Sequence, residues 1–320
     1  MAVEPIEIRI KGKPVSVPSV VFEDRTILVQ GKWIRIAAVH DENWVEGEII
    51  KDPETVVARL KKDKLEADLF TFAQKIPQTK PKYEYHYEWD NFAVVPITSY
   101  ADWWEKRLPQ ESRRNVRIAG KRGVVVKVAE FNDELARGIA EIYNETPIRQ
   151  GRSFCHYGKD VETVKRENAT YLERSQFIAA YCENELIGFM KLVYIDQVAS
   201  IMQFLSKNAH LDKKPMNALL AKAVELCEKR RSQYLVYRKF TYSKVYSPLT
   251  EFKRRNGFEE MQYPRYYVPL TWKGELGLRL RLHQGLRDSL PPSVITRLTK
   301  LRSKYIELFG PKKFIAVPPR

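Results

Sequence analysis

The stretch FIAAYCENELIGFMKLVY, residues 177–194, decides the fold of this chain. Two runs rich in β-branched and aromatic residues flank the polar break at residues 183–185, which is typical of a β-hairpin. Residues 199–206 predict a third strand, in which alternation of side chains places Ile201 and Phe204 on opposite faces. These three strands predict the centre of a sheet.

Two helices and two strands are predicted after this unit. Apolar residues recur every three or four positions after Pro215, which suits the first turn of a helix, and predict a helix over residues 215–230. Residues 234–240 predict a further strand. A cap at Ser247 and a stop at Gly257 predict a short helix between them, followed by a last strand over residues 258–270.

The order of these elements, over about residues 124–271, resembles the GNAT acyltransferase fold. The most specific piece is FKRRNGF at residues 252–258, which is similar to the family's Tyr-x-Lys-x-Gly-Phe ending, together with ELIGF at residues 185–189. The resemblance implies an α+β fold with a GNAT-like, mixed, mostly antiparallel sheet that is flanked by helices. It also implies that the third strand and the strand at residues 234–240 splay apart.

The loop before the long helix is where GNAT proteins bind the pyrophosphate of acyl-CoA. Their motif Arg/Gln-x-x-Gly-x-Gly/Ala lets backbone amides approach the cofactor, whereas this chain reads LDKKPMN at residues 211–217, without glycine. The expected cofactor-binding residues are Phe204, Leu205, Ser206, Lys213, Lys214 and Asn217. A backbone amide near residues 204–206 would polarise the reacting carbonyl. The tyrosine that often acts as general acid in GNAT enzymes falls at about Lys253.

A second resemblance covers residues 100–126, YADWWEKRLPQESRRNVRIAGKRGVVV. It is similar to the junction of FemAB-type aminoacyltransferases, where a basic helix joins two GNAT-like lobes. Those proteins use aminoacyl-tRNA and lack the glycine-rich loop, so the resemblance implies aminoacyl-tRNA as an alternative donor. The helix is predicted over residues 100–120, and its basic face would meet tRNA or be merely solvated. That face consists of Arg113, Arg114, Arg117, Lys121 and Arg122.

Four parts are expected along the chain. Residues 1–99 form a small mixed α/β lobe, a reduced GNAT-like lobe, and residues 100–123 form the basic connecting helix. Residues 124–271 form the GNAT-like acyltransferase domain, and residues 272–320 form a basic helical tail that binds a membrane surface or nucleic acid, or packs across a domain. In the small lobe, strands are expected at residues 6–10, 26–30, 33–37 and 89–97, and a helix at residues 53–62.

The polar loop at residues 147–160 is the expected substrate site. It contains two glycines and three cations without a helical or strand period, and scaffolded loops of this kind often carry function. Arginine suits bidentate contact with a carboxylate or phosphate. The expected substrate-binding residues are Arg149, Gln150, Arg152, Tyr157 and Lys159. His156 is the expected general base, with Tyr242 and Tyr246 as further catalytic candidates; a structural histidine and packing tyrosines are the alternatives.

Composition indicates a globular chain of 320 residues with 44% hydrophobic content. Three cysteines without a Cys-x-x-Cys pair indicate neither a disulfide framework nor a metal site, and they favour the cytoplasm. The chain has no apolar run of about eighteen residues and no secretion signal. A net charge of +15 implies attraction to polyanions such as RNA, DNA, anionic lipid or acidic polysaccharide.

Together the two resemblances imply a cytoplasmic acyl or aminoacyl transferase. It would act on an amine of a small molecule, glycan precursor or peptide, with His156 or a tyrosine taking the proton. The alternative is a catalytically inactive GNAT-like scaffold that binds RNA or an anionic surface, such as a membrane met by the tail. A degenerate partner subunit, active only with another chain, is a third hypothesis.

Overall fold

A computed structural model of the chain describes residues 3–10, 13–22, 25–42, 50–62, 65–149, 151–242 and 246–284, with the isolated positions 297 and 301. The strands are β1 (Glu4–Ile10), β2 (Lys13–Phe22), β3 (Arg25–Gln30), β4 (Ile36–Val39), β5 (Leu69–Ala73), β6 (His86–Pro96), β7 (Val125–Ala129), β8 (Ile148–Arg149), β9 (Arg152–Ser153), β10 (Ser175–Cys182), β11 (Glu185–Ile195), β12 (Val198–Ser206), β13 (Tyr234–Val236) and β14 (Glu259–Pro269). The α-helices are α1 (Pro53–Lys62), α2 (Tyr100–Asp102), α3 (Gln110–Lys121), α4 (Asp133–Asn144), α5 (Val161–Asn168), α6 (Pro215–Lys229), α7 (Pro248–Arg255) and α8 (Trp272–Arg279).

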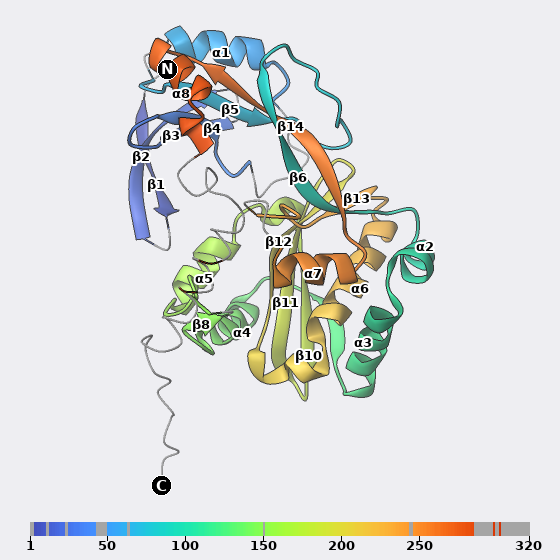
Figure 1. Cartoon of the computed structure of the whole chain (residues 1–320). Coiled ribbons are helices and arrows are strands. Elements are labelled where there is room, and N and C mark those ends of the chain that lie inside the picture. Colours follow the sequence, from blue (N-terminus) through green and yellow to red (C-terminus); the bar gives the residue numbers. More distant parts are fainter. Residues whose placement is uncertain are drawn as a thin grey trace.

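These strands form one large sheet and a separate ribbon of β8 and β9. The order in the large sheet is β1-β2-β3-β4-β5-β14-β6-β13-β12-β11-β10-β7, with parallel pairing only at β4–β5 and β12–β13 among the described strands. Helices flank the sheet (Figure 1). The predicted α+β class, with a mixed, mostly antiparallel sheet, is confirmed. Most of the predicted basic tail lies outside the described residues.

The predicted hairpin of β10 and β11 lies in the middle of the larger lobe. Glu183 and Asn184, which join the two strands, both have positive φ, as a two-residue hairpin turn requires. Ile178 packs into the core beneath α3 and α6, whereas Phe177 and Phe189 pack into the core beneath α4 and α5. The larger lobe is therefore a three-layer sandwich, with the two helix pairs on opposite sides in Figure 1.

The last strand of the larger lobe completes the sheet of the smaller lobe. β14 lies between β5 and β6, and Tyr266 is paired with Phe72 on one side and with Tyr87 on the other. The Tyr266 ring stacks on Phe72 at 5.0 Å, and its hydroxyl donates to Gln74 Oε1 at 2.9 Å. β6 also pairs with β13, so one sheet runs through both lobes, as Figure 1 shows.

β12 and β13 are parallel neighbours over only three residues. Ser200 pairs with Val236, after which β12 continues to Ser206 without β13 beside it. The strand predicted over residues 234–240 is wrong beyond Val236, because Arg238 has a φ of 49°, which an extended strand cannot contain. The two strands therefore splay apart, as the resemblance implies.

A β-bulge in β12 changes which core its last side chains enter. Ile201 and Gln203 have partners on β11, but Met202 between them has none. The predicted alternation is wrong here, because Phe204 packs into the same core as Ile201, beneath α6. Leu205 packs against the opposite core.

The connection between the lobes is not one helix. α2 continues as a π-helix over Trp103–Arg107, and α3 begins at Gln110. The helix predicted over residues 100–120 is wrong in the middle, because Pro109 cannot donate a helical hydrogen bond and clashes with the preceding turn. Trp103 is fully buried at this break.

In the small lobe, the helix predicted at residues 53–62 is confirmed by α1, and three of the predicted strands are confirmed by β1, β3 and β6. β2 and β5 were not predicted. The strand predicted at residues 33–37 is wrong at its start, because the chain bends from Lys32 to Ile34 and β4 begins only at Ile36.

Gly257→Ala tests the turn that ends the FKRRNGF segment. Gly257 has a φ of 80°, and a Cβ there would lie 3.0 Å from Trp103 Nε1 and 3.3 Å from the Arg107 carbonyl oxygen. We expect the substitution to lower the free energy of unfolding by about 1–3 kcal/mol, measured by urea denaturation. The control is Gly120→Ala in α3, where a Cβ meets no atom within 4 Å. Equal losses of stability in both variants would contradict this packing.

Candidate functional site

The space between the splayed strands is lined by aromatic side chains. The Phe204 ring on β12 lies 5.6 Å from the Tyr237 ring, which follows β13, and 5.9 Å from the Phe252 ring on α7. The Tyr237 ring lies 6.1 Å from that of Phe258. Burial raises the pKa of Tyr237 to about 12, so its hydroxyl keeps its proton at neutral pH. These rings therefore pack on one another where the two strands part.

Lys253 on α7 is buried among these rings, with an exposed fraction of 0%. Its Nζ donates to the Lys239 carbonyl oxygen at 2.5 Å and lies 4.6 Å from the centroid of the Tyr237 ring and 5.4 Å from that of Tyr242. Burial, with the nearby charge of Arg238, lowers the pKa of Lys253 to about 7. Near neutral pH such a lysine is present as both ammonium and amine, so it can donate a hydrogen bond or a proton.

The small lobe holds the segment that binds Lys253. Lys239 forms an ion pair through Nζ with Asp90 Oδ2 on β6, at 2.8 Å. Asp90 is also paired with Arg265 Nε on β14, at 3.2 Å. Burial would raise the pKa of Asp90, but the charges of Lys239 and Arg265 lower it below its ordinary value. The position of the buried lysine therefore depends on a charged pair from the other lobe.

Two backbone amides of the loop after β12 bind a carboxylate from elsewhere in the chain. The Glu145 carboxylate, just after α4, accepts hydrogen bonds from the amides of Asn208 at 2.6 Å and Ala209 at 2.8 Å. Arg149 Nη2 pairs with the same carboxylate at 3.2 Å, and its Nη1 donates to the Ser206 carbonyl at 2.9 Å. Two amides that precede the expected phosphate loop at residues 211–217 are therefore occupied by a side chain.

The expected substrate loop packs against the larger lobe through His156. The His156 ring stacks on Tyr143 at 4.3 Å, and its Nδ1 accepts a 2.9 Å hydrogen bond from Lys159 Nζ, which also pairs with Glu167 at 2.5 Å. Burial, followed by the charges of Lys159 and Arg238, lowers the pKa of His156 to about 4. The neutral ring then carries its proton on Nε2, which suits a hydrogen-bond donor better than the expected base.

Lys213 and Asn217, which were predicted to bind the cofactor, have partners within the protein. Lys213 Nζ lies 3.1 Å from Cys182 Sγ, and Asn217 Nδ2 donates to Asn256 Oδ1 at 2.8 Å. Lys214 has a φ of 56° and caps α6. Asn217 thus joins α6 to the end of α7, and Lys213 contacts the hairpin of β10 and β11.

Four of the other predicted residues are exposed. Arg152 lies on β9 and Tyr157 in the following turn, while Tyr246 is exposed before α7. Tyr242 is 39% exposed, and its ring faces Lys253. Gln150 lies outside the described residues.

The basic face of α3 is smaller than predicted. Arg113 and Arg122 donate to main-chain carbonyls through Nη1, so part of their hydrogen-bonding capacity is used within the protein. The cations that project from the described face of α3 are Arg114, Arg117 and Lys121.

The fold of this chain is similar to that of a known structure. FemX matches this chain with a TM-score of 0.57 and 11% identity, over 87% of this chain and 90% of its own. The chain has a GNAT-like fold of the FemAB type. L-PGS from Bacillus licheniformis matches this chain with a TM-score of 0.55 and 14% identity, over 90% of each chain.

A third structure, the C-terminal domain of a putative lysylphosphatidylglycerol synthetase from Agrobacterium fabrum, has a TM-score of 0.54 and 12% identity, over 84% of this chain and 89% of its own. At such identities the likeness shows the FemAB-type fold and not the activity. No family model and no curated protein sequence matches the chain. Among the described residues there is no group of three or more metal-ligating side chains, and none of the described helices is long and apolar enough to cross a membrane.

Three residues of this candidate site were missed by the sequence analysis. Lys253 was noted only as the position of an absent tyrosine, and its sequence signal is a lysine inside the FKRRNGF segment. Glu145 and Asp90 carry no such signal, since each is an ordinary acidic residue until the fold places it beside Asn208 or Lys239.

Lys253→Met tests the buried ammonium. The folded pKa of about 7 lies below the ordinary lysine value of about 10.4. The unfolded chain therefore binds more protons between these pH values, so this group adds stability as pH rises. From about pH 7 to about pH 9, wild type should gain stability relative to K253M by up to about 1.4 kcal/mol per pH unit, measured by urea denaturation.

Lys229→Met, at an exposed position of α6, is the control and should follow the wild type at both pH values. The same pH dependence in wild type and K253M would contradict the lowered pKa of Lys253.

Proposed function

We propose that the chain transfers an acyl or aminoacyl group from an activated donor to an amine, at the splay of β12 and β13 beside α7. Lys253 carries this proposal, because it is a cation buried among apolar rings at the splay of a FemAB-type fold. A carbonyl oxygen there would gain negative charge during transfer. A preorganised ammonium stabilises an oxyanion more strongly in an apolar site than in water.

In the proposed reaction, the neutral acceptor amine attacks the carbonyl carbon of the donor. The C–N bond forms, and Lys253 donates a hydrogen bond to the tetrahedral oxyanion. The C–O bond to the leaving hydroxyl then breaks, and that oxygen takes the proton that the amine loses. Tyr242 is the proposed proton carrier, since its ring faces Lys253, with Tyr246 further out. His156 would orient the acceptor through Nε2–H.

Aminoacyl-tRNA is the proposed donor, in preference to acyl-CoA. The Glu145 carboxylate binds the amides of Asn208 and Ala209, just before the expected phosphate loop, and its charge would repel a pyrophosphate there. The exposed cations Arg114, Arg117 and Lys121 on α3 supply charges for a phosphate backbone. The proposed acceptor is an amine of a small molecule, glycan precursor or peptide, bound by the loop that contains Arg149, Arg152, Tyr157 and Lys159.

The second hypothesis is a catalytically inactive scaffold that binds RNA. The exposed cations of α3 favour it as much as they favour the enzyme, and in a scaffold Lys253 would only bind the Lys239 carbonyl. The two hypotheses therefore differ in what Lys253 does.

Calorimetric titration with aminoacylated tRNA, uncharged tRNA and acetyl-CoA, at low and high salt, tests the donor. We expect binding of tRNA that weakens steeply with salt, and no binding of acetyl-CoA. Tight acetyl-CoA binding by the wild type would contradict the proposed donor.

Two sets of variants separate chemistry from RNA binding. Lys253→Met should lower transfer to an amine acceptor by at least about 100-fold and leave tRNA affinity unchanged. Alanine at Arg114, Arg117 and Lys121 together should weaken tRNA binding about tenfold or more and reduce its salt dependence. Lys229→Met is the matched control for both measurements. RNA binding without any transfer, in wild type and K253M alike, would support the scaffold.

A further inference from the structure

Helix α8 of the small lobe presents large apolar side chains to solvent. Trp272 is 79% exposed, Leu276 48% and Leu280 59%. These residues are four positions apart, so they lie on one side of the helix. Large apolar side chains gathered on one exposed face usually mark an interaction surface.

The opposite side of α8 is fixed to the small lobe through two glycines. A Cβ at Gly274 would lie 1.9 Å from the Asp68 carbonyl oxygen, and one at Gly277 would lie 2.7 Å from Ile34 Cδ1. Because both glycines are buried in close contact with the lobe, the helix cannot roll its apolar side inward. The exposed face is therefore a consequence of how the helix is attached.

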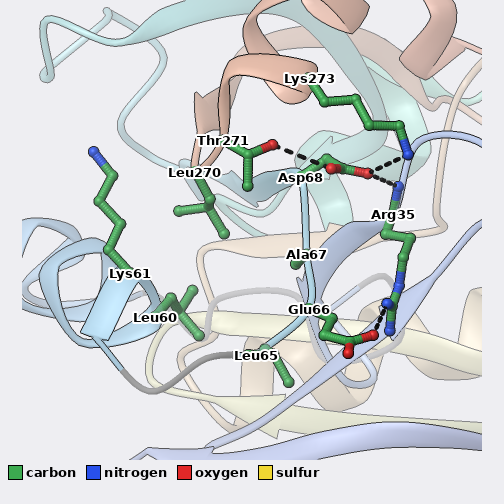
Figure 2. Close-up of a pocket in the computed structure, with 10 residues that line it drawn as sticks. All are labelled: Arg35, Leu60, Lys61, Leu65, Glu66, Ala67, Asp68, Leu270, Thr271 and Lys273. Carbon is green, nitrogen blue, oxygen red and sulfur yellow. Dashed lines mark hydrogen bonds and ion pairs between the residues drawn. The ribbon is translucent and has the colours of Figure 1, made fainter.

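The Asp68 carboxylate binds both the start of α8 and the segment before β4. Figure 2 shows Asp68 accepting a hydrogen bond from Thr271 at 3.1 Å and pairing with Lys273 at 3.4 Å, while the Arg35 amide donates to it at 2.8 Å. Ile34, next to Arg35, packs on α8, and the preceding residue, Trp33, is 86% exposed.

A tight turn presents Trp33 to solvent. Gly31 has a φ of 108°, and a Cβ there would lie 2.1 Å from the Ile34 carbonyl oxygen, so only glycine permits the turn. The hollow beside the Asp68 clamp, about 450 Å³, has an apolar floor of Leu60, Leu65 and Leu270 (Figure 2). The exposed apolar face of α8, formed by Trp272, Leu276 and Leu280, is here called the tryptophan surface.

The charges around the tryptophan surface are mostly positive. The exposed ionisable side chains of α8 and of the residues just after it are Lys273, Arg279, Arg281 and Glu275. Arg279 is paired with Glu275 at 3.2 Å and Lys273 with Asp68 at 3.4 Å, which leaves three cations against two carboxylates.

We propose that the tryptophan surface docks on a bilayer of anionic phospholipid. Tryptophan and leucine enter the boundary between headgroups and acyl chains, while flanking lysine and arginine attract anionic headgroups. RNA would pair with the cations but would give no reason for exposed leucines, so charge and apolarity together favour lipid. The surface lies on the small lobe, and the inference stands whether or not the chain is a transferase.

Vesicle binding of the full chain tests this surface. The chain should sediment with phosphatidylcholine vesicles that contain about 30% phosphatidylglycerol and not with pure phosphatidylcholine vesicles. Its tryptophan emission should shift to shorter wavelength on binding. The double variant W272S/L280S should partition about tenfold more weakly, and the emission shift should shrink.

Trp89→Ser is the matched control, because Trp89 is a half-exposed tryptophan on β6 outside this surface. It should bind vesicles like the wild type. Vesicle binding that is unchanged in W272S/L280S would overturn the proposal, as would an absence of vesicle binding by the wild type. Loss of tRNA binding in W272S/L280S, without any vesicle binding, would assign the surface to nucleic acid instead and overturn the lipid assignment.

Discussion

The pairing of β6 with β13 on one side and with β14 on the other is the constraint on which both lobes depend. β13 is only three residues long, and each of them bonds to both β12 and β6. The next residues leave β12 but stay on β6, because the Tyr237 amide donates to the Ala93 carbonyl and the Ala93 amide donates to the Arg238 carbonyl. The opening in the larger lobe is thus held from the smaller lobe, which is why a site that lies in one half needs both.

The charges buried between the lobes are stable only as a set. Arg265 pairs with Glu42 at 2.7 Å as well as with Asp90, and Lys75 donates to the Glu42 carbonyl at 2.7 Å. Burial would raise the pKa of Glu42, but the charges of Arg265 and Lys75 lower it below its ordinary value. Removing one member would leave an unpaired charge out of water, at a cost of several kcal/mol. Lys253 is connected to this set through Lys239, so the charge at Lys253 is coupled to the packing of the lobes.

Elements with local signals could be predicted from the sequence, and long-range features could not. The hairpin turn at Glu183 and Asn184, the helix that begins at Pro215 and the capped helix that ends at Gly257 all depend on residues close in sequence. The left-handed backbone at Arg238 has no such signal, since arginine rarely adopts it.

The long-range contacts of the candidate site could not be predicted from the sequence. The loop after β12 was identified from the resemblance, but its anion is a carboxylate 63 residues earlier in the chain, and no local pattern indicates that pairing. The bulge at Met202 was likewise not predictable from the sequence. It places Phe204 on the face opposite to the predicted one, because one unpaired residue reverses the alternation of a regular strand.

The place of β14 also affects how the chain can fold during synthesis. The gap between β5 and β6 stays unfilled until residue 269 has been made, about 170 residues after β6, which takes on the order of 10–30 s at ordinary rates of translation. During that interval both strands have open edges next to buried aromatic residues such as Phe70 and Phe72, and open edges favour association with other chains. A nascent small lobe therefore needs protection until its missing strand emerges.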